Sequence, residues 1–155
     1  MLSEKTLDYL IIIFSALLVC VFIFRFIIKD NQKSFSINVA KITISRLDGT
    51  QIKLVDMVKN KDEAYILLFR LNDCYSCITK GLSDLQNLSK SGYECIAIVI
   101  HDCLPDVKGF AEMFSGISFH QLTIKEQYEY IHSPYFPVIL SLKNKRVVNY
   151  RFITL

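Results

Sequence analysis

The sequence predicts an α/β domain, with a central mixed sheet flanked by helices, preceded by one transmembrane helix. Two continuous apolar runs, residues 64–71 and 93–100, have the length of strands that are covered on both faces of a sheet. The segment between them repeats apolar residues at helical spacing, namely Ile78, Leu82, Leu85 and Leu88. Strand, helix and strand therefore predict a right-handed βαβ unit with parallel strands. A longer apolar run precedes this unit.

That longer run is interpreted as a membrane anchor at residues 1–28. Residues 9–24 carry no charged side chain, and after Arg25 the apolar run continues to residue 28. About twenty helical residues span the roughly 30 Å hydrocarbon core, with Arg25 close enough to the end to snorkel. A cleaved signal peptide is the rival interpretation, but it has an apolar region of about 7–15 residues after a positively charged start. Here Glu4 and Asp8 lie before the run, so a retained anchor that inserts through residues 9–28 is favoured.

Charge on either side of the anchor gives a first expectation about orientation. Arg25, Lys29 and Lys33 follow most of the span, whereas Lys5 and the α-amine precede it. The positive-inside rule alone therefore places the rest of the chain in the cytoplasm. Residues 29–40 are interpreted as a polar tether and residues 41–155 as a single domain, which suits a chain of 155 residues.

The domain is expected to begin and end with hairpins. Residues 41–47 alternate apolar and polar side chains, Asp48-Gly49 is a tight-turn signal, and residues 51–54 resume the alternation. The other expected elements are a short helical or turn segment at 55–60, a helix at 106–115, a weak strand at 119–124, a short polar helix at 125–132, and strands at 138–142 and 146–153 joined by a turn at 143–145.

Cys74 and Cys77 stand where the first buried strand becomes a helix. The first N–H groups of a helix lack internal partners and carry the positive end of the dipole, so they stabilise a thiolate. In such a setting the pKa of a cysteine falls from about 8.5 to between about 3.5 and 7.5. Cys77 lies roughly one turn further on and can attack a mixed disulfide on Cys74. The pair predicts a dithiol that exchanges disulfides, with Cys74 as nucleophile.

Three residues border this pair as active-site neighbours: Asp73, Tyr75 and Ser76. Asp73 is expected to cap the helix that starts at Cys74. Its negative charge is expected to oppose the Cys74 thiolate. A zinc site at Cys74 and Cys77 would need four ligands, and the sequence has no second Cys-x-x-Cys and no closely spaced histidine pair. We therefore expect no metal and no cofactor.

Two further cysteines lie at or after the second buried strand. Cys95 falls inside the strand and is interpreted as a core residue. Cys103 follows the strand and His101, at the sheet edge where open α/β folds place their chemistry. It is a possible third thiol or, with His101, a metal ligand, although a loop residue without a role is the more usual case.

The order of these parts resembles the thioredoxin superfamily. The parts that carry this resemblance are the Asp-Gly hairpin, the apolar strand, the Cys-x-x-Cys that opens a helix, the parallel strand, and a proline leading a terminal hairpin. Most similar are the membrane-anchored, extracytoplasmic redoxins of the TlpA and ResA type. The resemblance covers roughly residues 41–153. It implies that Pro137 is a cis-proline packed against the active-site cysteines, that Phe136 offers backbone to a bound partner, and that the domain lies outside the cytoplasm.

The chain also departs from the pattern of that superfamily. Asp73 stands where a tryptophan usually precedes the first cysteine, and Leu68 stands where cytoplasmic thioredoxins carry a buried aspartate. A peroxiredoxin is not expected, because Leu71 occupies the place of the Thr or Ser that orients peroxide in that family.

The sequence therefore predicts a membrane-anchored thiol-disulfide oxidoreductase. Its partners would be protein or small-molecule disulfides, with an upstream dithiol or disulfide to restore the pair, and no nucleic acid. Two alternatives stay open. One is a tethered copper-binding or delivery protein of the Sco type, with Cys74, Cys77 and one of His101, His120 or His132 as soft ligands. The other is a domain of the same fold that only docks partners.

Overall fold

The computed structural model describes residues 17–19, 35–58, 62–101 and 107–155. The chain divides into two compact units, Met1–Phe35 and Ser36–Leu155. In the first unit Leu17, Leu18 and Val19 are helical. No helix within the described ranges is long and apolar enough to cross a membrane. The anchor predicted at residues 1–28 lies almost wholly outside the described residues.

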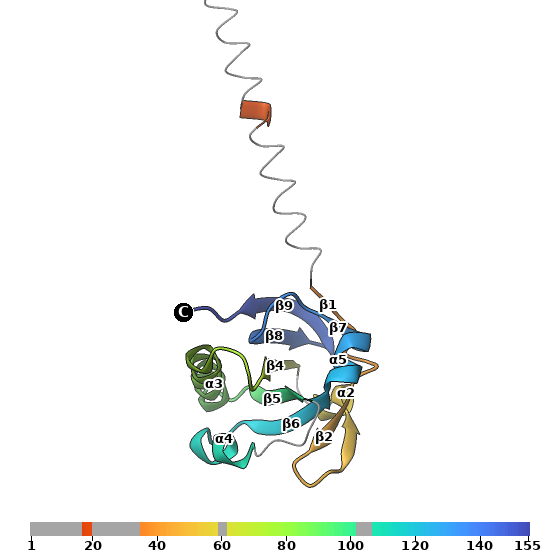
Figure 1. The fold of residues 1–155 in the computed structure, drawn as a ribbon, viewed down its shortest axis with the longest axis vertical. Coiled ribbons are helices and arrows are strands. Elements are labelled where there is room, and N and C mark those ends of the chain that lie inside the picture. The colour runs from red at the N-terminus through yellow and green to blue at the C-terminus, as the bar shows by residue number, and fades with distance from the viewer. Residues whose placement is uncertain (1–16, 20–34, 59–61, 102–106) are drawn as a thin grey trace, which may run out of the picture. The chain divides into compact units, whose positions relative to one another are not determined.

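The second unit is built on a mixed sheet, shown in Figure 1. Among the described residues seven strands form it, in the order β3-β2-β6-β5-β4-β8-β9. The central strands β4, β5 and β6 are parallel, and the strands outside them pair antiparallel. The strands are β2 (Thr43–Arg46), β3 (Gln51–Lys53), β4 (Glu63–Arg70), β5 (Glu94–His101), β6 (Ser118–Thr123), β8 (Val138–Lys143) and β9 (Arg146–Phe152).

The predicted βαβ unit is confirmed. β4 and β5 run parallel, with Ala64 opposite Glu94 and Arg70 opposite Ile100. Helix α3 (Tyr75–Lys90) connects them. It ends at Ser91, after which Gly92 adopts a φ of +91°, the left-handed conformation that glycine takes without a steric penalty. This arrangement places the end of β4 and the start of α3 at the same edge of the sheet.

Helices α3 and α4 (Lys108–Met113) share one core with the sheet. Figure 1 shows them on one side of the strands, with α2 (Leu54–Met57) and α5 (Ile124–Tyr130) on the other. Side chains of β4 and β5 alternate between the two faces, which is why continuous runs in both strands are buried. The core on the α3 side contains Leu67, Phe69, Ile78, Leu82, Leu85, Ala97 and Val99, with Phe110 packed against it.

Both predicted hairpins are present. β2 and β3 pair around the Asp48-Gly49 turn, where the Asp48 carboxylate accepts hydrogen bonds from the backbone N–H and hydroxyl of Thr50. β8 and β9 pair around Asn144 and Lys145, which both have positive φ angles. Positive φ at both central residues characterises the two-residue turn whose twist matches the flanking strands.

A second, two-stranded sheet was not predicted. β1 (Ser36–Ile37) pairs antiparallel with β7 (Ile131–His132). Ser36 and Ile37 belong to the stretch interpreted as a tether, and His132 was expected at the end of a helix that in fact ends at Tyr130. Strands of two residues are too short to show an alternating pattern, so hydrophobic periodicity cannot reveal them.

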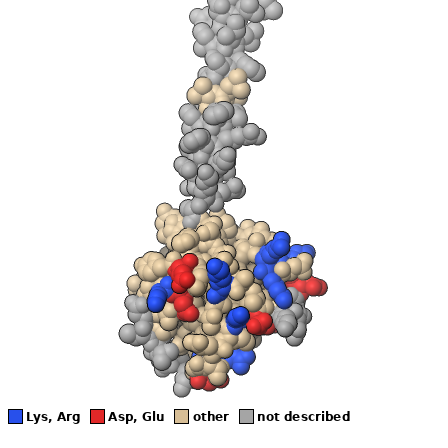
Figure 2. All heavy atoms as spheres, turned by 90° about the vertical axis from the view of Figure 1, so that its right-hand side faces the viewer, with Lys and Arg blue, Asp and Glu red and all other residues tan. Residues whose placement is uncertain are grey.

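Charged side chains are mixed on the face seen in Figure 2, which is the right-hand side of Figure 1. Lys and Arg side chains occur beside Asp and Glu side chains, separated by uncharged surface. Neither sign forms a continuous area on this face.

A dithiol at the start of helix α3

The strand-to-helix turn that carries the cysteines is closed by hydrogen bonds between Arg70 and Asp73. The backbone N–H of Arg70 donates to Oδ2 of Asp73 at 2.7 Å, and the N–H of Asp73 donates to the carbonyl of Arg70 at 3.1 Å. Cys74 is then the N-cap residue of α3, and its carbonyl accepts the N–H of Ile78 at 3.0 Å. The turn thus places Cys74 at the free N–H groups of the helix.

The expectation that Asp73 caps α3 is wrong. The helix begins one residue later than expected, with Cys74 as its N-cap and no side-chain capping bond. The Asp73 carboxylate points back toward β4 and accepts the Arg70 N–H instead. An aspartate carboxylate can accept from the backbone N–H groups of a helix start or from those of a neighbouring residue, and here it accepts from the strand end.

Cys74 is exposed and its thiol is the more acidic of the pair. Hydrogen bonding from the Cys77 side chain, from the Ser76 hydroxyl and from the Cys77 backbone lowers the pKa of Cys74 below its ordinary value. The Ser76 oxygen lies 3.2 Å from the Cys74 sulfur. Hydrogen bonds to the charged form of a group favour that form. Exposure and acidity together suit Cys74 to attack a disulfide.

Cys77 differs from Cys74 in both respects. It is 6% exposed. Its hydrogen bond to Cys74, its burial and the negative charge of Cys74 raise the pKa of the Cys77 thiol. The carboxylate of Asp73 raises it further, while the ammonium of Lys80 lowers it. The Asp73 charge was expected to act on Cys74, and the structure places its effect on Cys77. One exposed thiol with a lowered pKa therefore lies beside one buried thiol with a raised pKa.

The loop before β8 lies at the end of β4 from which the chain leads to Cys74. The Phe136–Pro137 peptide bond is cis, as predicted. Val138, the next residue, pairs with Leu68 of β4, so the loop is held at the end of the strand that leads to Cys74. The carbonyl of Pro137 accepts the N–H of Ile153 at 2.9 Å, which also ties the loop to the end of β9.

Arg70 connects the turn to this loop and was missed by the sequence analysis. Its Cζ lies 4.6 Å from the centre of the Phe136 ring, a cation–π contact. One guanidinium nitrogen donates to Oε1 of Gln127 at 2.8 Å. Gln127 lies on α5, is 3% exposed, and donates to the carbonyl of Ile131. The sequence contains one signal that could have pointed to Arg70: an arginine at the end of a largely apolar strand.

Exposed apolar side chains stand close to Cys74 in the sequence and in the loop before β8. Leu71, Tyr75 and Tyr135 are 43%, 64% and 67% exposed. Tyr75 leans toward Phe110 of α4, with ring centres 6.4 Å apart, and Tyr135 meets Phe152 of β9 edge to face at 5.7 Å. Tyr75 is thus directed toward α4, and Tyr135 toward β9.

The other candidate residues lie elsewhere or cannot be placed. Cys95 is 2% exposed in β5, and burial raises the pKa of its thiol to about 11. Cys103 lies outside the described residues. The histidines considered as copper ligands are dispersed: His101 ends β5, His120 lies within β6, and His132 is in β7. No three His, Cys, Asp or Glu residues of the described chain group together in a way that could hold a metal ion.

Known proteins resemble this chain in structure. The chain matches no protein-family model and no curated protein sequence. A thioredoxin-like protein from Porphyromonas gingivalis is similar with a TM-score of 0.58 at 14% identity, over 72% of this chain and 77% of that one. A thiol:disulfide interchange protein from Bacteroides sp. has a TM-score of 0.55 at 17% identity, over 74% and 80%.

A secreted disulfide oxidoreductase from Mycobacterium tuberculosis, homologous to E. coli DsbE, has a TM-score of 0.51 at 12% identity, over 72% of this chain and 83% of its own. These proteins share the arrangement of strands and helices with this chain over the parts that match. The fold of this chain is therefore thioredoxin-like, an α/β fold with a mixed sheet flanked by helices.

Proposed function

We propose that this chain is a thiol-disulfide oxidoreductase that acts through Cys74 and Cys77. The asymmetry of the pair carries the proposal: an exposed thiol with a lowered pKa lies beside a buried thiol with a raised pKa. Nucleophilic attack requires the thiolate, and release of a partner requires a second sulfur within reach. The thioredoxin-like fold and the disulfide oxidoreductases among its structural neighbours support the same activity.

The reducing direction runs in two exchange steps. The Cys74 thiolate attacks one sulfur of the partner disulfide, forms a mixed disulfide and releases the other partner sulfur as a thiolate. Cys77 then loses its proton to solvent and attacks the Cys74 sulfur. The Cys74–Cys77 disulfide forms, the mixed disulfide breaks, and the second partner thiolate leaves. The partner gains two electrons and the chain is left as the Cys74–Cys77 disulfide. An upstream dithiol then supplies two further electrons, which reduce that disulfide while the donor itself becomes a disulfide.

Residues 1–28 are proposed to anchor the domain to a membrane, and the domain is proposed to lie on the extracytoplasmic side. The uncharged run at residues 9–24 supports the anchor. A phosphatase fused after Ile153 should then be active, and a membrane-impermeant maleimide should label Cys74 in reduced intact cells. Labelling that needs cell lysis would contradict the orientation while leaving the redox proposal standing.

Trapping of partners tests the redox proposal directly. Cys77→Ser removes the sulfur that resolves the mixed disulfide, so this variant should accumulate a partner on Cys74 that a reducing agent releases. Cys74→Ser should accumulate none, because Cys77, the remaining thiol of the pair, is buried. The proposal would be rejected by two results together. The first is that both variants trap partners equally, or that neither does. The second is that the parent chain fails to reduce a model disulfide.

A further inference from the structure

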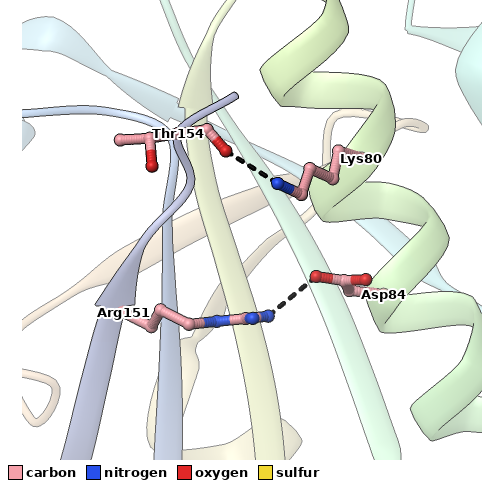
Figure 3. Close-up of polar contacts among 4 residues, drawn as sticks. All are labelled: Lys80, Asp84, Arg151 and Thr154. Carbon is pink, nitrogen blue, oxygen red and sulfur yellow. Dashed lines mark hydrogen bonds and ion pairs between the residues drawn. The ribbon is translucent and has the colours of Figure 1, made fainter.

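The end of β9 and the residues that follow it are bound to helix α3 by polar contacts, as Figure 3 shows. Nζ of Lys80 donates to the carbonyl of Thr154 at 2.8 Å. One turn further on, the guanidinium of Arg151 and the carboxylate of Asp84 form an ion pair at 2.7 Å. Between these contacts Gly81 is buried, and an added Cβ there would lie 3.5 Å from Ile153. The helix that carries Cys77 is thus tied to the chain end at successive turns.

Lys80 lies on the same side of the helix as the resolving cysteine. It follows Cys77 by three residues, and residues three or four apart on a helix are neighbours. A lysine on an exposed helix surface normally samples many rotamers, and the bond to Thr154 limits that sampling. The positive charge is therefore kept near the first turn of α3.

We propose that Lys80 is a positioning residue for the second exchange step, in which its ammonium, held by the Thr154 carbonyl, favours ionisation of Cys77 and speeds release of the partner. This inference rests on the proposed function and assigns a role to a residue outside the dithiol itself. Cys77 must lose a proton before it can attack the Cys74 sulfur, and a nearby opposite charge favours the ionised form.

The other groups around Cys77 act against its ionisation, which is why a cation matters there. The sulfur is buried, and the Asp73 carboxylate raises the pKa of the thiol. Lys80 acts on the same thiol in the opposite direction and lowers its pKa. Asp73 and Lys80 therefore form a pair of opposite charges on either side of Cys77 in the sequence, with opposing effects on one proton.

Arg151 provides a matched control for the charge of Lys80. Both side chains join α3 to the same chain segment, and both are cationic. Arg151 meets the helix one turn further from Cys77, at Asp84. Loss of Arg151 should loosen the same docking without removing the cation beside the thiol. Lys80→Arg keeps a positive charge at the position and should retain most of the effect.

The experiment measures the resolving step in the full-length chain, solubilised in detergent. Cys74 is first loaded with a chromophoric aromatic thiol as a mixed disulfide, and release of the thiol is followed from pH 6 to pH 10. Lys80→Met should slow release about two- to five-fold at neutral pH, the range expected for an exposed charge. It should also move the pH profile to higher pH. The difference should shrink between 0.05 and 1 M salt, because exposed charges are screened.

A partner-free measurement separates this inference from the proposed function. In a Cys74→Ser background, alkylation of Cys77 by iodoacetamide is followed against pH by mass spectrometry of the peptide that contains it. Lys80→Met should shift this profile to higher pH, and Lys80→Arg and Arg151→Met should leave it close to the parent. An unshifted profile for Lys80→Met, or an equal shift for Arg151→Met, would overturn the proposal even if partner trapping succeeds. A shifted profile without partner trapping would reject the proposed function alone.

Discussion

The guanidinium of Arg70 lies over the ring of Phe136, with Cζ 4.6 Å from the ring centre. This contact joins the turn before Cys74 to the loop that carries the cis Phe136–Pro137 bond. The same guanidinium donates to the buried amide oxygen of Gln127. One side chain therefore joins the end of β4 to two segments that lie at least 57 residues further along the chain, helix α5 and the loop before β8.

Replacement of Arg70 by Met should destabilise the domain. A cation–π contact contributes about 0.5–2 kcal/mol, and a buried acceptor left without its donor costs about 1–3 kcal/mol. We expect the free energy of unfolding to fall by about 1–3 kcal/mol, measured from urea midpoints at an unchanged slope. Arg70→Lys keeps the charge but lacks the planar group, so its free energy of unfolding should lie between those of the parent and the Met variant. A Met variant as stable as the parent would show that the contact is dispensable.

The three described cysteines should alkylate in a fixed order. Cys74 is exposed with a lowered pKa and should react first with iodoacetamide in the reduced protein. Cys77 should follow more slowly, because it is buried and its pKa is raised. Cys95, whose pKa is about 11, should react only on unfolding. Peptide mass spectrometry at timed intervals measures the order, and earlier modification of Cys77 than of Cys74 would reverse the assigned roles.

Asp73→Asn should lower the pKa of Cys77. The carboxylate raises that pKa by its charge, and the asparagine removes the charge while keeping an oxygen that can accept the Arg70 N–H. The resolving step should therefore quicken at neutral pH. Asp73→Ala removes the charge and the acceptor together. It should therefore also lower the pKa of Cys77, and it should in addition destabilise the domain. Rates of mixed-disulfide release against pH measure the first effect, and an unmoved profile for Asp73→Asn would contradict it.

His120 should make stability depend on pH below neutrality. It is 4% exposed in β6, and burial, assisted by Arg46 and opposed by Asp48, lowers its pKa to about 4. An unfolded histidine takes up a proton near pH 6.5. Between these values the unfolded chain binds more protons than the folded one, so stability is full above about 6.5 and falls as pH decreases to about 4.

His120→Leu should remove that part of the pH dependence. Urea midpoints at pH 7, 5.5 and 4.5 measure it, and His132→Gln, at an exposed position, serves as the control. If the Leu variant loses as much stability on acidification as the parent, other groups are responsible.

Much of the fold could be predicted from the sequence because its long elements carry strong periodic signals. Burial alone explains the apolar runs of β4 and β5 and the helical spacing of α3. Turn chemistry explains the hairpin at Asp48-Gly49. Cys74 and Cys77 were found because their spacing falls where a strand pattern becomes a helical one, and Pro137 was found through the resemblance to the thioredoxin superfamily. Arg70, Gln127 and Lys80 were not found, because their roles depend on partners 57 or more residues away or on a neighbouring charge. The direction of the Asp73 side chain was set by a local hydrogen bond to the Arg70 N–H, which replaces the expected helix cap.

The position of β4 between β5 and β8 has a consequence for synthesis of the chain. β4, α3 and β5 can assemble as soon as residue 101 is available, but one edge of β4 has no partner until Val138–Lys143 has been made. During that interval both thiols exist beside an unpaired apolar strand edge, a geometry prone to association with other chains. The loop before β8 and Thr154, which binds Lys80, are synthesised after both cysteines. A nascent chain thus has its reactive sulfurs before it has the surroundings that control them.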